Sequence, residues 1–73
     1  MPEVRNIDGR DMEPPEPLER TLEALATLPA DGEVVLRVNC EPFPLYGILD
    51  RSGYVHTSQR QPDGSNEVRI RKG

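Results

Sequence analysis

Residues 8–28, DGRDMEPPEPLERTLEALATL, decide the fold, because they join three closely spaced prolines to a helical pattern of apolar residues. Proline is favoured in the first turn of a helix, where its missing N–H costs nothing and its φ is already helical. The apolar residues that follow recur at helical spacing: Leu18, Leu22, Leu25 and Ala26. We therefore predict a helix over residues 15–28 whose apolar stripe packs on a sheet.

Short segments of alternating apolar and polar residues surround this helix. They predict four strands, at residues 4–8, 33–39, 54–61 and 67–72. The turn residues Pro-Asp-Gly-Ser-Asn at 62–66 join the last two strands into a hairpin. A second helix is predicted within residues 40–53, CEPFPLYGILDRSG, because Pro42 and Pro44 can occupy its first turn and Gly53 can end it.

This element order, βαβαββ, predicts a two-layer α/β sandwich. Right-handed crossovers make the first two strands parallel and place both helices on one face of a four-stranded mixed sheet. The chain of 73 residues is long enough for one domain only, so residues 1–73 form a single unit. The predicted core is a set of aliphatic side chains: Leu18, Leu22, Leu25, Val34, Leu36, Val38, Leu45, Ile48, Leu49, Val68 and Ile70.

The two predicted helices begin with the same Pro-x-Pro-Leu pattern. It occupies residues 15–18 and 42–45, an offset of 27 that also carries Ile7 onto Val34. Either the chain begins with two related βα units, or the pattern reflects the ordinary way in which a helix follows a strand.

The charge distribution argues against nucleic acid as a partner. The net charge is −4, so a site that neutralises phosphates is not expected. The C-terminal part is more basic, and its cations are predicted on an edge hairpin: Arg69, Arg71 and Lys72. There they would form a solvated surface that discourages strand association, or a docking site for an acidic partner.

The sequence also favours a cytoplasmic protein. A single cysteine, Cys40, cannot form an internal disulfide, and no signal segment or membrane-spanning run is present. We expect a monomer that does not bind membranes.

Both predicted helices begin at the carboxyl edge of the sheet, where open α/β folds commonly hold ligands. This edge contains residues 11–16 and 39–43. Two helix N-termini could attract an anion. Several carboxylates occupy the same edge, however, and we expect them to satisfy the helix dipoles themselves: Asp11, Glu13, Glu16 and Glu41.

The motif Asp8-x-x-x-x-x-x-Pro15-Glu16-Pro17, followed by an amphipathic helix and a βαββ remainder, resembles the TusA (SirA-like) sulfur-carrier proteins. The resemblance covers nearly the whole chain. That family has the pattern Asp-x-x-Gly-x-x-Cys-Pro-x-Pro, whose cysteine carries a persulfide at the head of the first helix. In this chain Asp11 replaces the glycine and Pro14 replaces the cysteine. The resemblance therefore implies the family's fold without its nucleophile, as in an uncharacterised branch of TusA-like domains.

Cys40 and His56 are the remaining residues that could carry chemistry. A position before the second helix favours a thiolate at Cys40, but neighbouring Glu41 opposes it. We interpret Cys40 as a small residue at a strand end and His56 as a partly buried, hydrogen-bonded side chain. A metal site formed by both, with Asp8 or Glu13, has no ligand spacing to support it, so neither metal nor cofactor is predicted.

These observations leave two hypotheses for function. The first is a non-catalytic domain that binds a protein or ligand, and the second is a sulfur or redox transfer protein that uses Cys40 in place of the missing cysteine. A rim rich in proline is rigid and poor in N–H donors, which suits a protein contact better than a phosphate. We predict that a partner contacts this rim, with Met12 and Phe43 as anchors, at the following residues: Met12, Glu13, Pro14, Pro15, Glu16, Cys40, Glu41 and Phe43.

Overall fold

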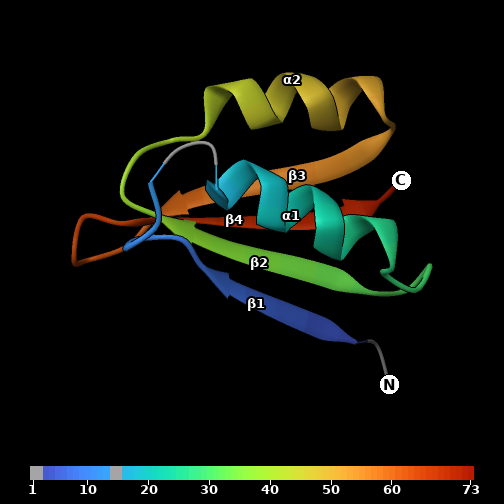
Figure 1. Ribbon diagram of the computed structural model, residues 1–73, viewed down its shortest axis with the longest axis horizontal. Coiled ribbons are helices and arrows are strands. Elements are labelled where there is room, and N and C mark those ends of the chain that lie inside the picture. Colours follow the sequence, from blue (N-terminus) through green and yellow to red (C-terminus); the bar gives the residue numbers. More distant parts are fainter. Residues whose placement is uncertain (1–2, 14–15) are drawn as a thin grey trace.

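The computed structural model describes residues 3–13 and 16–73 and confirms the predicted βαβαββ order (Figure 1). The six elements and their bounds are β1 (Val4–Asp8), α1 (Glu16–Ala26), β2 (Glu33–Val38), α2 (Phe43–Arg51), β3 (Tyr54–Arg60) and β4 (Asn66–Lys72).

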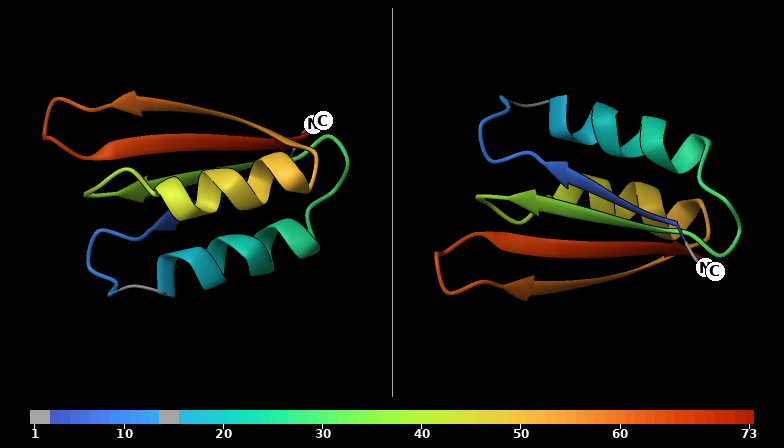
Figure 2. Two further views of the ribbon diagram at one scale, coloured as in Figure 1. Left: turned by 90° about the horizontal axis from the view of Figure 1, so that it is seen from above. Right: turned by 90° about the horizontal axis from the view of Figure 1, so that it is seen from below.

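The four strands form one mixed sheet in the order β1-β2-β4-β3. β1 and β2 are parallel, whereas β4 is antiparallel to both of its neighbours. Both helices cover one face of the sheet and begin at the same end, as predicted (Figure 2). The β3–β4 hairpin lies at the edge of the sheet, as predicted, but the basic residues belong to its inner strand, β4, and β3 is the outer strand.

The first helix is shorter than predicted. It ends at Ala26, where the Arg5 guanidinium binds the carbonyls of Ala24 (2.9 Å) and Thr27 (3.2 Å). A cation at the last carbonyls stabilises a helix C-terminus. The predicted start at Pro14 and Pro15 lies outside the described residues.

The second helix begins and ends as its sequence predicts. Phe43 and Pro44 occupy its first two positions after the cap residue Pro42. Gly53 follows its C-terminus with φ +81°, a left-handed conformation that glycine adopts without strain.

The offset of 27 between the two Pro-x-Pro-Leu segments holds for the helix starts. Pro17 and Pro44 are each the second residue of a helix, so the offset of 27 is retained there. β1, however, ends at Asp8, eight positions before α1 begins at Glu16, whereas β2 ends at Val38, five positions before α2 begins at Phe43. The two βα units are therefore similar in plan but differ in the length of the connection between strand and helix.

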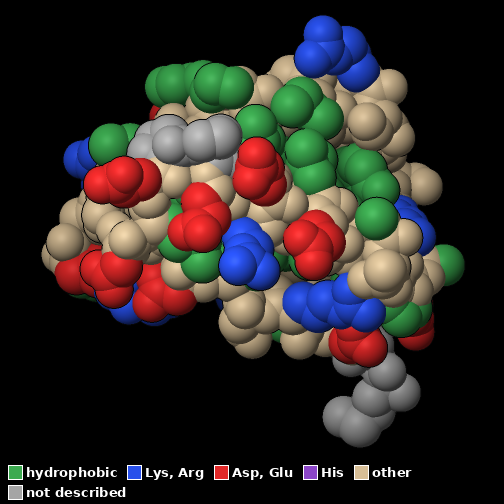
Figure 3. Space-filling view, viewed as in Figure 1, with side chains coloured by type: hydrophobic (Ala, Val, Ile, Leu, Met, Phe, Trp, Pro, Cys, Tyr) green, Lys and Arg blue, Asp and Glu red, His purple; other side chains and the backbone are tan. Residues whose placement is uncertain are grey.

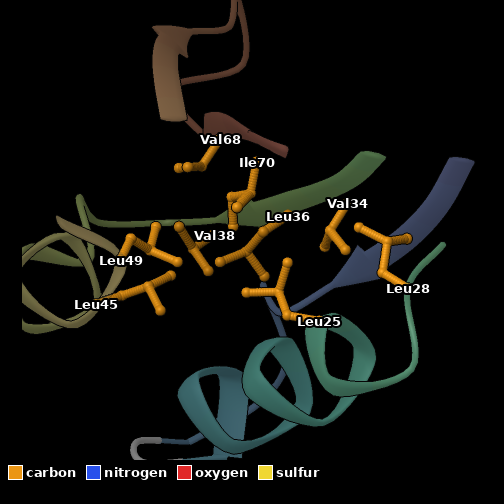
Figure 4. Packing of buried hydrophobic residues seen from close by; sticks show 9 residues of the cluster. All are labelled: Leu25, Leu28, Val34, Leu36, Val38, Leu45, Leu49, Val68 and Ile70. Atoms are coloured by element: carbon orange, nitrogen blue, oxygen red, sulfur yellow. The ribbon is translucent and has the colours of Figure 1, made fainter. Parts of the chain in front are cut away.

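The core lies between the helices and the inner faces of β2 and β4 (Figure 4). Most predicted members are buried, and Leu28 joins them from beyond the end of α1. Leu18 and Leu22 are only half-buried, and Ile48 is partly exposed outside this cluster, so its assignment to the core is wrong. Fully buried Thr21, which the apolar pattern misses, satisfies its hydroxyl by donating to the Pro17 carbonyl at 2.8 Å.

The sheet face without helices carries a network of ion pairs. Arg69 binds Glu33 and Glu67, and Arg37 binds Glu67, each at 3.0 Å. These contacts hold the pKa of Glu67 below its ordinary value, with the hydrogen bond from Arg37 as the main cause. Arg69 is therefore already paired with this chain's own carboxylates, which argues against its predicted role in docking an acidic partner.

Leu36 is fully buried at the centre of the core and offers a direct test of the packing. Leu36→Ala should reduce the free energy of unfolding by about 2–5 kcal/mol, because it leaves a cavity that the small domain cannot close. Val55→Ala, at a side chain that is 48% exposed on the other face, should change it by about 0.5 kcal/mol or less. Urea melts measure both, and equal midpoints for Leu36→Ala and the parent would refute the core assignment.

Candidate functional site

Arg10 joins three loops at the carboxyl edge of the sheet. Its guanidinium binds Asp8 at 2.8 Å and Asp63, in the β3–β4 turn, at 3.4 Å. Its carbonyl accepts a hydrogen bond of 2.8 Å from the Asn39 side-chain amide, in the loop before α2. The segments that follow β1 and β2 are thus fixed to each other at the edge where the sequence analysis places the site.

The pairing of Arg10 with Asp8 dominates the electrostatics of this junction. Hydrogen bonds from the Arg10 side chain and backbone lower the pKa of Asp8 from 3.8 to about 2. The pKa of Asp63 is lowered as well, chiefly by the hydroxyl and backbone N–H of Ser65. Asp8 and Asp63 are thus committed to local contacts. The expectation that edge carboxylates cap the helices does not hold for Glu41, whose carboxylate accepts from the side chains of Ser58 and Tyr46, because α2 has no side-chain cap hydrogen bond.

The predicted site residues divide between two hollows. Met12 is half-buried beside α1 and β1, in a hollow that it shares with Asp8, Arg20 and Glu23. Cys40, Glu41 and Phe43 lie on the α2 side and line a second hollow. Glu13 and Glu16 are exposed and line neither hollow, and Pro14 and Pro15 lie outside the described residues.

The second hollow contains residues that sequence reasoning misses. Asn39, which the sequence analysis already places at this edge, also lines it, and the three residues that it misses are Ser58, Arg60 and Asn66. Asn66, which the sequence assigns to a turn, is the first residue of β4, with Val38 as its neighbour on β2 and Arg60 on β3. Residues at facing positions of a ladder share one side of the sheet. Asn66 and Arg60 are therefore on the same face of the sheet as α2, next to the loop that carries Cys40.

An aromatic row runs from the head of α2 to β3. The Phe43 and Tyr46 rings are perpendicular to each other with a centroid distance of 5.9 Å, and Tyr46 stacks on His56 at a centroid distance of 4.7 Å. His56 Nε2 lies 3.2 Å from Asp50 Oδ1, in agreement with the structural role predicted for this histidine. Burial raises the pKa of Tyr46. The contact with Tyr46 covers one side of the Phe43 ring and leaves 68% of the Phe43 surface exposed.

Charged and apolar groups are both present on the helical face of the molecule. Acidic side chains gather at the end where β1 and β2 finish, and hydrophobic side chains lie over the start of α2 (Figure 3). Among residues 3–13 and 16–73, no three His, Cys, Asp or Glu side chains come together as a metal site would require. Neither helix in these ranges has the length and hydropathy needed to span a membrane.

The fold and its proline-headed edge define a SirA-like domain. The crystal structure of the SirA-like protein from Desulfitobacterium hafniense matches this chain with a TM-score of 0.81 and 28% sequence identity, and the match covers 92% of this chain and 93% of that one. Residues 6–72 match the family described as Uncharacterized conserved protein (DUF2249). The chain belongs to this family, which confirms the resemblance drawn from the proline motif. No curated protein matches the chain.

The Asp8–Arg10 contact can be tested by titration. Asp8 should titrate with a pKa of about 2, and Arg10→Ala should move it part of the way back toward 3.8, because the hydrogen bonds from the Arg10 guanidinium are lost while the one from the backbone N–H remains. NMR titration of the Asp8 carboxyl carbon measures both values, and the same pKa in the two proteins would contradict the contact. Since the folded state lowers this pKa, Asp8 stabilises the protein above pH 3.8, and its contribution disappears as the pH falls from there to about 2.

Proposed function

We propose that this domain is a non-catalytic protein-interaction module whose contact surface is the carboxyl edge of the sheet, with its centre at the head of α2. The exposed ring of Phe43 is the observation that carries the proposal. A large aromatic side chain that is 68% exposed in a small domain is available to a partner.

The surroundings of Phe43 support this role because they hold the ring in place before a partner arrives. Pro42 and Pro44 restrict the backbone on both sides of it, and the contact with Tyr46 limits its rotamers. An anchor that is already ordered loses less entropy on binding. Interface anchors are commonly aromatic side chains of this kind.

The sequence at the head of the first helix supports a role without persulfide chemistry. Pro14 occupies the position at which the resemblance to the TusA-like sulfur carriers would place a cysteine, and proline has no nucleophilic side chain. Met12 lies in the hollow beside α1, and the Asn39–Arg10 hydrogen bond connects its loop to the loop before α2. A partner that covers both loops would contact Met12 as a second anchor.

The interaction proposal predicts that one exposed aromatic side chain controls partner binding. Immobilised parent protein and the Val55→Ala variant should retain the same proteins from a lysate of the source cell, whereas Phe43→Ala should lose them or bind about tenfold more weakly. Val55 is the matched control because it is an exposed apolar residue on the opposite face of the sheet. Equal retention by all three proteins would refute the role of Phe43.

A second candidate function, sulfur or redox transfer through Cys40, is supported by the exposure of this thiol and by the cationic side chain of Arg60 in the same hollow. The interaction module and the sulfur-transfer protein predict different covalent modifications of Cys40. For an interaction module, intact-mass analysis of protein from persulfide-producing cells should show no sulfur that cyanide removes. A cyanide-labile gain of one sulfur, absent from Cys40→Ser, would replace the first candidate by the second.

A further inference from the structure

The hollow in front of Cys40 is lined by an asparagine that is almost entirely buried and whose side-chain amide pairs with no other residue that the structure describes. Asn66 is only 5% exposed, yet its side-chain amide makes no hydrogen bond within the part of the chain that the structure describes. No polar side-chain atom there is both sealed from solvent and unpartnered. The Asn66 amide must therefore reach the surface of the hollow, where it can donate to and accept from a bound molecule.

Two side chains of opposite charge, Arg60 and Glu41, line the same hollow. Arg60 lies beside Asn66 in the β3–β4 ladder and forms no ion pair with another described residue. Glu41 enters from the loop before α2, and its carboxylate accepts hydrogen bonds from Ser58 (3.1 Å) and Tyr46 (3.5 Å). A ligand with an amino group and a carboxylate would complement both charges.

Cys40 supplies the reactive group of the same hollow. It is exposed, and it is the only cysteine in the sequence. Thiol, guanidinium, carboxylate and free amide thus converge from the α2 loop, β3 and β4. The exposed Phe43 ring adds an apolar wall for the carbon chain of a ligand.

We propose that this hollow binds disulfides of small amino-acid-derived thiols and exchanges with them at Cys40. The ligand carboxylate binds Arg60, its amino group faces Glu41, and its amide or carbonyl groups pair with Asn66. The Cys40 thiolate attacks one ligand sulfur, the ligand S–S bond breaks, and a new bond forms between Cys40 Sγ and that sulfur. The other half leaves as a thiolate and takes up the proton that Cys40 released, so the ligand disulfide is the oxidant and one small thiol is the product.

This proposal narrows the second candidate function to disulfide exchange, but it requires neither a persulfide nor a protein partner. Intact mass distinguishes disulfide exchange from sulfur transfer, since exchange adds one thiol molecule to Cys40 and sulfur transfer adds one sulfur atom. If the protein carries no cyanide-labile sulfur, sulfur transfer is refuted, but a mass gain of one thiol molecule on Cys40 would still confirm the exchange site.

The test compares oxidised glutathione, which carries carboxylates, with cystamine, which has amino groups only. Intact mass gives the rate of mixed-disulfide formation on the folded chain for the parent, Arg60→Gln and Arg71→Gln. Arg60→Gln should slow the reaction with oxidised glutathione by roughly 5- to 10-fold and leave cystamine unchanged or faster, because only the former loses a charge contact. Arg71→Gln removes an equal charge from the helix-free face and should change neither rate.

A second measurement reports on Asn66 without altering the fold. Its side-chain amide signals in a ¹⁵N NMR spectrum should shift when Cys40 carries glutathione and should stay in place when Cys40 carries cysteamine. Equal effects of Arg60→Gln on both disulfides, or unmoved Asn66 signals in the glutathione adduct, would overturn the proposal and leave Cys40 an ordinary surface thiol.

Discussion

The apolar inner face that β2 shares with β4 is the constraint on which the rest of this structure depends. Val34, Leu36, Val68 and Ile70 are completely buried there, and the two short helices cover them. Because β4 must lie beside β2 to complete this face, β3 becomes the outer strand under α2. This strand order places the start of β4 between the end of β2 and the end of β3. Asn66 thereby reaches the hollow in front of Cys40, so the candidate site is a consequence of how the core closes.

Local chemistry made much of this fold predictable. Alternation in residues 33–38 and 67–72 identified two strands, and prolines located the head of α2. Sheet order was less accessible, because a hairpin can join a sheet through either of its two strands. Burial of Thr21 and exposure of Ile48 were missed for a related reason. Helical spacing shows which side of a helix is apolar. Whether a residue at the border of that apolar side is buried depends on where the neighbouring strand lies.

The candidate site was predictable only next to a helix start. Cys40, Glu41 and Phe43 are adjacent in sequence and precede or begin α2, so the carboxyl-edge argument found them. Arg60 and Asn66 are separated from them by a strand and a turn and come close only through the β3–β4 ladder. Pro-Asp-Gly-Ser-Asn is typical of a turn, which concealed Asn66 as a strand residue. The functional emphasis accordingly shifts from the head of α1, where the SirA-like resemblance implies it, to the head of α2.

That shift is the central claim, and amide chemical-shift mapping tests it most directly. The ¹⁵N-labelled domain would be titrated with a protein that the parent retains and Phe43→Ala does not. The account predicts that the largest shifts fall on residues 39–43 and on Ser58, Arg60 and Asn66 around the second hollow. Shifts confined to Val35, Thr57 and Arg69, on the sheet face without helices, would contradict it.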